Sequence, residues 1–333
     1  MSIEKKIPKF PNRRQFIYGG LAAGLGSGGS IWAWQQLQRS RLSDSTVPLK
    51  GETRLPKPQG DPSNPLVFLR NFDYGTTKQE NGRTIREFRV EARTSTLQLN
   101  NAVSLISWNL NGQVPAPTLR ATEGDRIRVI FFNKAGHPHS LHFHGIHPAE
   151  MDGVKPVRNN QVFIYEFDAE PYGVHPYHCH IAPVTRHISK GLYGMMIIDP
   201  PEPRPQADEM AMIMGGYDVN EDHKNELFAF NGKPNYYMQH PIDIKQNQLI
   251  RLYLLNMIEY DPVVTFHIHA NFFQVYPTGM TTTPTQTADV ITMGTAERHI
   301  LEFSYPYLGE YMFHPHQDAI AESGCMGMFN VIS

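Results

Sequence analysis

The sequence predicts an all-β protein of two β-sandwich domains, and three observations support this fold class. From about Leu66 onward, short runs of β-branched and aromatic residues alternate with Gly and Pro turn signals, and a long helical periodicity is missing. Three blocks of sequence also recur in the same order in both halves, which indicates two copies of one domain. The strands expected from the pattern include Thr96–Leu99, Arg126–Phe132, Gln161–Phe167, Gly194–Ile198, Leu249–Leu255 and His299–Phe303.

The composition excludes several classes of protein. The chain has 333 residues and a net charge of −2, which argues against a protein that binds nucleic acid through a basic surface, so no nucleic-acid partner is expected. Its 2 cysteines cannot form a disulfide framework. Its 16 histidines are numerous for this length and clustered, which points to metal chemistry.

Residues 1–45 are expected to be a targeting segment rather than part of the fold. Basic residues, including the pair Arg13-Arg14, precede a charge-free run from Ile17 to Trp34, which is the pattern of a twin-arginine export signal. A basic tail on a short anchor helix is the alternative. The signal predicts a protein that is periplasmic, or membrane-anchored and facing the periplasm, and residues 46–65 are expected to be a proline-rich linker.

A proline-rich segment divides the remaining chain into two domains, 66–202 and 203–333. Four prolines lie between Asp199 and Gln206, and prolines at this density cannot continue a sheet. The recurring blocks lie on either side of this boundary. HSLHFHG (139–145) aligns with VTFHIHA (264–270), GVHPYHCH (173–180) with GEYMFHPH (309–316), and GLYGM (191–195) with GCMGM (324–328).

Four His-x-His pairs lie within these blocks, each on or beside an expected strand. Alternation along a strand directs both histidines of a pair to the same face. A single histidine of this kind is ordinarily a hydrogen-bonded structural residue, but eight imidazoles on apolar strands are poorly solvated unless a metal takes up their lone pairs. Imidazoles without carboxylates favour copper over calcium, magnesium or manganese, and eight of them indicate several ions. The pairs are His142/His144, His178/His180, His267/His269 and His314/His316.

Cys179 lies between two of these histidines and therefore points to the opposite face of the strand. A second, buried site is expected there. His187 follows on the next loop, and His139 should project opposite to His142. One thiolate and two imidazoles form the ligand set of a blue-copper site.

The axial position of this copper falls on Leu192, by analogy with blue-copper proteins. Leucine has no donor atom, so a three-coordinate site with a raised potential is expected. Met195 and Met196 are the alternative ligands, but we interpret them as strand residues. The second domain has lost this site, because Pro315 replaces the cysteine and Val264 replaces the first histidine.

Met210, Met212 and Met214 alternate at the start of the second domain. A track for cuprous ions is one reading of this pattern. A half-buried opening strand is the interpretation we favour.

The motifs HSLHFHG, YHCH with the downstream HISKGLYG, FHIH and FHPHQDA together resemble those of the multicopper oxidases, over about residues 66–333. The pattern is similar to the two-domain, laccase-like branch with the type 1 copper in the first domain. The resemblance implies two cupredoxin-like Greek-key β-sandwich domains and four coppers per subunit: one type 1, one type 2 and two type 3. By this resemblance His142 and His267 match the type 2 ligands, and the type 3 ligands are His144, His178, His180, His269, His314 and His316.

The resemblance also implies the reaction and the assembly. Four one-electron oxidations of a phenolic or other small donor, metal ions included, are coupled to reduction of O₂ to water. The donor is expected to dock near His187, and electrons to pass through Cys179. In two-domain relatives the trinuclear cluster lies between subunits, so a homotrimer is expected.

Two acidic residues are candidates to supply protons. Asp152 matches the acidic residue that the family places beside the trinuclear cluster, although an aspartate before glycine is also a common turn residue. Asp318 lies two residues past His316 and is the second candidate. The glutamate that some relatives carry just after the His-Cys-His motif is missing.

Two other functions remain open at this stage. A copper-containing nitrite reductase is also two-domain, but it needs only one three-histidine copper besides the blue site and an aspartate where this chain has His142. A non-catalytic electron-transfer protein would leave the His-x-His pairs without a purpose. The copper count separates the three functions.

Overall fold

The computed structural model describes Val47–Pro48 and residues 64–333, all of which belong to one compact unit. The expected export signal and most of the expected linker fall on residues 1–46 and 49–63, outside the described residues. Among the residues described, no helix combines the length and the apolar character of a membrane span.

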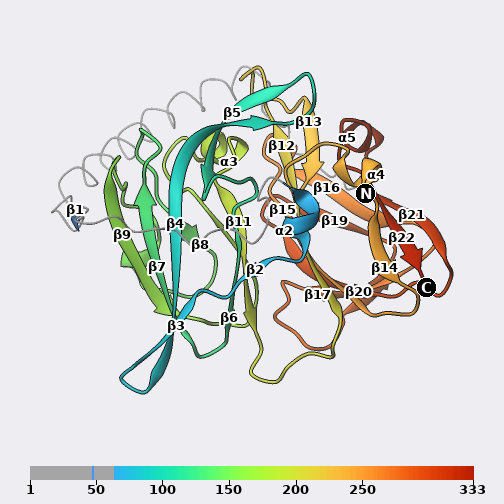
Figure 1. Cartoon of the computed structure of the whole chain (residues 1–333), viewed down its shortest axis with the longest axis horizontal. Helices are drawn as coiled ribbons and strands as arrows, with labels where there is room; N and C mark the ends of the chain where they lie inside the picture. Colours follow the sequence, from blue (N-terminus) through green and yellow to red (C-terminus); the bar gives the residue numbers. More distant parts are fainter. Residues whose placement is uncertain (1–46, 49–63) are drawn as a thin grey trace, which may run out of the picture. The chain divides into compact units, whose positions relative to one another are not determined.

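The first half of the described chain forms two sheets, and the prediction of an all-β fold is confirmed (Figure 1). Sheet I has the order β1-β9-β7-β4-β3 with β5 paired to β4, and sheet II has the order β2-β6-β11-β10-β8. Short helices α2 (Pro65–Leu69), η1 (Ala149–Met151) and α3 (Val184–Ser189) accompany them. The strands are β1 (Val47–Pro48), β2 (Phe72–Asp73), β3 (Thr76–Glu80), β4 (Arg83–Gln98), β5 (Ser104–Leu110), β6 (Thr118–Thr122), β7 (Arg126–Asn133), β8 (His142–Phe143), β9 (Gln161–Asp168), β10 (Gly173–His178) and β11 (Tyr193–Asp199).

The second half forms two further sheets. Sheet III has the order β13-β12-β15-β20-β17-β18, and sheet IV has the order β14-β22-β21-β16-β19. The helices are α4 (Tyr236–Gln239) and α5 (Asp318–Glu322). The strands are β12 (Asp208–Tyr217), β13 (Leu227–Phe230), β14 (Ile242–Lys245), β15 (Ile250–Asn256), β16 (Val263–Ile268), β17 (Phe273–Pro277), β18 (Gln286–Ala288), β19 (Val290–Gly294), β20 (Arg298–Phe303), β21 (Gly309–His314) and β22 (Gly327–Ile332).

The expected strands agree with β7, β9, β11, β15 and β20 to within a residue or two at each end. Thr96–Leu99 overlaps only the end of β4, which is 16 residues long. The charged residues of β4 concealed its length. Glu91, for example, is buried in the sheet because Lys134 and Arg93 pair with it.

Three apolar cores hold the four sheets in the order I, II, III, IV. One core lies between sheets I and II, and another lies between sheets III and IV. The third core joins the two halves, because the alternating side chains of β11 face two different cores. Met196 and Ile198 pack inside the first half, whereas Met195 and Ile197 pack against the second half.

Strand β12 has the same double role, which corrects one expectation. Met210, Met212 and Met214 are fully buried between sheets III and IV, so they are strand residues as expected. The strand is not half-buried, however. Ala211 and Ile213 on its other face are also fully buried, because they pack against the first half.

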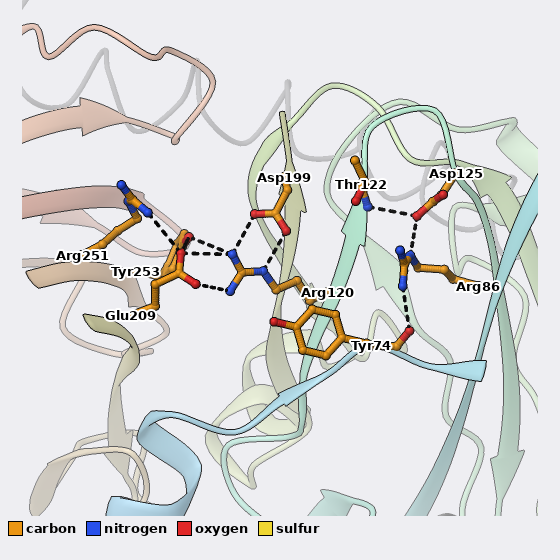
Figure 2. A network of polar contacts seen from close by, with 9 residues as sticks. All are labelled: Tyr74, Arg86, Arg120, Thr122, Asp125, Asp199, Glu209, Arg251 and Tyr253. Atoms are coloured by element: carbon orange, nitrogen blue, oxygen red, sulfur yellow. Dashed lines mark hydrogen bonds and ion pairs between the residues drawn. The ribbon is translucent and has the colours of Figure 1, made fainter. Parts of the chain in front are cut away.

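A buried arginine reinforces this contact between the halves (Figure 2). Arg120 on β6 donates to both carboxylate oxygens of Asp199 at 2.8 and 2.9 Å and to both of Glu209 at 2.7 and 3.0 Å. Glu209, on β12, also accepts from the hydroxyl of Tyr253 at 2.7 Å and from Arg251 at 3.2 Å. Burial opposes the charge of Arg120, but the hydrogen bonds to Asp199 and Glu209 outweigh it and raise the pKa of the guanidinium. Arg120 therefore stays charged, and its ion pairs with Asp199 and Glu209 connect the two halves.

We predict that Arg120→Met lowers the free energy of unfolding by roughly 3 kcal/mol, because it removes the cation that Asp199 and Glu209 share and leaves only Arg251 to pair with Glu209. Urea denaturation monitored by circular dichroism measures the loss. Arg83→Met is the matched control, since Arg83 pairs with Asp168 on the surface and such pairs contribute about 0.2–1 kcal/mol. Equal losses in the two variants would contradict the role of Arg120.

Candidate metal centres

The first candidate centre brings together three side chains from separate segments of the first half. His139 follows β7 and forms an isolated bridge with Val157, Cys179 follows β10, and His187 lies in α3. The Sγ atom of Cys179 lies 3.1 Å from Nδ1 of His187 and 3.7 Å from Nδ1 of His139, and the two Nδ1 atoms are 3.1 Å apart. One ion placed among these atoms can contact all three.

The electrostatics of this centre suit a soft metal ion. Burial, with a smaller effect of the neighbouring imidazole of His187, lowers the pKa of His139 to about 3. Burial lowers the pKa of His187 to about 4, so both imidazoles are neutral at pH 7 and their lone pairs are free. Burial raises the pKa of the Cys179 thiol, but a coordinating ion deprotonates a thiol outright. The donor set of one sulfur and two imidazole nitrogens therefore fits copper.

Backbone hydrogen bonds hold two of the three ligands in place. His139 and Val157 exchange N–H···O=C bonds at 3.1 and 2.8 Å, and the N–H of Cys179 donates to the carbonyl of Leu192 at 3.0 Å. Leu192 is fully buried in the same apolar core as Cys179. Met196 packs in this core as a β11 residue, whereas Met195 on the opposite face packs between the halves.

A second group of histidines lies where β8 and β10 pair in sheet II. His142 and His178 face each other in the register of these strands, and each begins one His-x-His pair. Nε2 of His144 lies 3.3 Å from Nε2 of His178, and the rings of His142 and His180 are 5.0 Å apart. Burial lowers the pKa of His144 to about 3 and that of His178 to about 4. We call these four residues the first half-site.

The second half repeats this arrangement on β16 and β21 of sheet IV. His267 and His314 face each other in register, Nε2 of His269 lies 3.0 Å from Nε2 of His314, and the rings of His267 and His316 are 5.2 Å apart. We call these four residues the second half-site. The sequence repeat is therefore also a repeat of side-chain geometry.

The two half-sites are separate within one chain. In the described part of the chain, each cluster of potential ligand atoms draws its histidines from one half only. The first half-site lies on sheet II and the second on sheet IV, with sheet III packed between these sheets.

Backbone carbonyls orient one histidine of each pair in the half-sites. Nδ1 of His142, His178, His267 and His314 lies 2.7–3.0 Å from the carbonyl oxygens of Asp152, Cys179, Asp289 and Pro315, respectively. A neutral imidazole can only donate to a carbonyl, so the proton is on Nδ1 and the Nε2 lone pair is free for a metal. This observation shows that the half-sites fit metal ions.

Acidic side chains lie beside both half-sites, one of them not predicted. The Asp152 carboxylate is 3.1 Å from Nδ1 of His142. The Asp289 carboxylate is 4.0 Å from Nδ1 of His267, the equivalent position. Asp289 is far from His267 in sequence and approaches it because β16 pairs with β19, so only that pairing could have revealed it. Asp318 begins α5, and its carboxylate makes no hydrogen bond or ion pair within the described residues.

Comparison with known proteins gives two matching family models, each described as multicopper oxidase, over residues 91–203 and 204–333. A solved structure titled as a multicopper oxidase is 45% identical, covers 81% of this chain and 97% of its own, and superposes with a TM-score of 0.80. The copper-containing nitrite reductase of Neisseria meningitidis is 26% identical over 73% of this chain and 68% of its own length. The L-ascorbate oxidase of Cucumis sativus is 30% identical over 55% of this chain and 32% of its own.

We predict that the metal-free protein loses stability as the pH falls from about 7 to about 5. An unfolded imidazole, with a pKa near 6.5, binds a proton that buried His139 with a pKa of about 3 does not bind. The contribution of the neutral His139 to the free energy of unfolding is therefore fully present above about pH 6.5 and is lost as the pH falls. By pH 5 the loss from this residue alone is about 2 kcal/mol. Urea unfolding at several pH values measures the slope. His139→Leu should lower it, and an unchanged slope would refute the argument.

Proposed function

The chain belongs to the multicopper oxidase family, and on this premise we propose that it is a laccase-like oxidase that couples four one-electron oxidations of small donors to the reduction of O₂ to water. The family implies a copper-dependent oxidoreductase. The donor class, the number of coppers and the assembly are parts of the proposal.

The orientation of residues 178–180 carries this proposal. Sγ of Cys179 faces His139 and His187, whereas Nε2 of the adjacent His178 faces Nε2 of His144. Bound copper would supply the one-electron acceptor at the first centre and the site of O₂ reduction at the half-sites. The protein contributes a short covalent path, through Cys179 and its neighbours, between the buried first centre and the imidazoles of the first half-site.

The ligand assignment follows the resemblance. Cys179, His139 and His187 would hold the type 1 copper, and Leu192 offers it no donor atom. His142 and His267 would hold the type 2 copper, and their Nε2 atoms are free for it because carbonyls occupy their Nδ1 atoms. The six other histidines of the half-sites would hold the type 3 pair, which gives four coppers per subunit.

Nitrite reduction is the alternative suggested by the Neisseria relative. Such an enzyme has an aspartate at the position of His142, whereas here His142 orients its ring toward three other imidazoles. Two half-sites of four imidazoles exceed the needs of a single type 2 copper. The oxidase accounts for every one of them.

A homotrimer completes the cluster in this proposal. Each half-site alone offers too few ligands for three coppers, and the two lie apart in one chain. Large apolar side chains next to both are exposed: Ile146, beside the first, is 63% exposed, and Phe272, beside the second, is 62% exposed. A head-to-tail contact between the first half-site of one subunit and the second of the next would cover both, and three such contacts close a ring.

Asp152 is the proposed proton carrier for the cluster, since its carboxylate lies against the type 2 ligand His142. The prediction for Asp318 stays a prediction. Its position at the start of α5, two residues past His316, supports it only through sequence proximity.

The test of the function is to load the full chain with copper and measure its metal content, its absorption and its oxygen uptake with a phenolic, a ferrous and a cuprous donor. We expect four coppers per subunit, an intense thiolate-to-copper band and consumption of O₂ without release of peroxide. Cys179→Ser should lose one copper, the intense band and oxygen uptake. Two coppers per subunit with turnover of nitrite would establish the alternative instead.

The acid residues are tested in the same assay. Asp152→Asn should keep its copper and its blue band but consume oxygen at least about 100-fold more slowly, with a changed pH profile, because it lacks a proton donor. Asp318→Asn is the matched comparison. Normal uptake by Asp152→Asn would remove it from the mechanism.

The shared cluster is tested by mixing two inactive variants. One carries His144→Ala and His178→Ala in the first half-site, and the other carries His269→Ala and His314→Ala in the second. Co-refolded as mixed rings, they should recover about one quarter of the wild-type uptake, because that share of contacts joins two intact half-sites. No recovery in rings shown to be mixed would mean that the cluster is not shared between subunits.

A further inference from the structure

The three ligands of the first centre are closed off from solvent. His139 and Cys179 are 0% exposed and His187 is 5% exposed. Little of His187 is therefore available for direct contact with a donor in solution. A more exposed group that touches the imidazoles would offer a donor a larger contact surface.

The indole of Trp108 is that group. Its ring centroid lies 4.8 Å from the ring of His187 and 5.6 Å from the ring of His139. Trp108 is itself partly exposed, so one ring contacts both imidazole ligands and solvent. In the described part of the chain it is also the only tryptophan.

Trp108 is held firmly to the segment that carries His187. It lies on β5, and its N–H donates to the carbonyl of Lys190 at 3.0 Å, just after α3. The hydroxyl of Ser107 donates to the same carbonyl at 2.9 Å. These bonds fix the distance between the indole and the buried imidazoles, as a path for electrons requires.

The outer surroundings of Trp108 are π faces and cations. The ring of the exposed His137 lies 4.9 Å from the indole, and the guanidinium of Arg186 lies 5.6 Å over it. Among the described residues, no hydrogen bond joins the indole to a carboxylate. The nearby Glu221 is engaged by Arg186 at 3.0 Å and by Lys190 at 2.8 Å. An imidazole and a guanidinium therefore flank the indole, and these are surroundings in which a planar aromatic ring can stack.

We propose that Trp108 is the contact through which an electron-rich aromatic donor, a phenol or an aromatic amine, delivers electrons to the first centre. The donor stacks on the exposed part of the indole and loses one electron, and a copper ion held by Cys179, His139 and His187 would supply the one-electron acceptor. The O–H bond of a phenol breaks in this step, its proton passes to water, and a phenoxyl radical leaves. The inference rests on the proposed oxidase function and names the substrate class of that site.

The test is anaerobic reduction of the copper-loaded protein by 2,6-dimethoxyphenol, followed as bleaching of the thiolate-to-copper band in a stopped-flow instrument. In Trp108→Leu the second-order rate should fall about tenfold or more, while the copper content, the band and the potential of the first centre stay unchanged. Trp108→Phe, which keeps an aromatic face, should retain most of the rate. Tyr307→Leu, at a 73% exposed residue of the second half, is the control for losing a surface aromatic side chain.

Each other outcome overturns part or all of the inference. An unchanged or faster rate in Trp108→Leu would show that the indole only covers the centre. If a changed potential of the first centre explains the slower rate of the variant, Trp108 acts by setting that potential and not by contacting the donor. An equal loss with ferrous ion as donor would overturn the aromatic assignment.

Failure of the proposed function has a different signature. The bleaching reaction needs no O₂ and no half-site. If the phenol bleaches the wild-type protein faster than Trp108→Leu but the wild type consumes no oxygen, the oxidase function is refuted and this inference stands. In the metal-free protein the phenol should quench a part of the indole fluorescence that is missing in Trp108→Phe, a variant that keeps Trp32 and Trp34. This difference in quenching is a second readout that is independent of copper.

Discussion

Neighbouring side chains of an extended backbone point in opposite directions, and the arrangement of the metal centres depends on this constraint at residues 178–180. Cys179 points into the core between sheets I and II, where His139 and His187 meet it, and His178 points toward the first half-site. A shift of one residue in the register of β10 would exchange these faces and separate Cys179 and His178 from their partners. The antiparallel pairing of β10 with β11 and β8 fixes that register.

The order of the sheets determines where each half places its histidines. Both faces of sheet II are covered, one inside the first half and the other by the second half. Its histidines lie at the edge strand β8 and at the adjoining end of β10. The equivalent histidines of the second half lie on sheet IV, beyond sheet III. The two similar half-sites thus follow the sequence repeat, while only the first repeat has a cysteine between the histidines, where the second has Pro315.

Sequence reasoning succeeded where a property is local. The pairs around His142 and His267 predicted two similar clusters, because a strand period of two residues places such pairs on one face. It could not find Asp289 or Trp108, since each reaches its histidine through strand pairing or loop contacts between distant segments. It also missed the double burial of β12, because an alternating methionine pattern does not show what covers the other face.

The apolar layer between β11 and β12 couples the packing of the two repeats. Met195 and Ile197 of the first repeat share a dry layer with Ala211 and Ile213 of the second, so neither repeat retains an independent surface there. Enlarging a side chain on one strand must be compensated by shrinking one on the other. Either half excised alone would therefore expose this apolar layer to water.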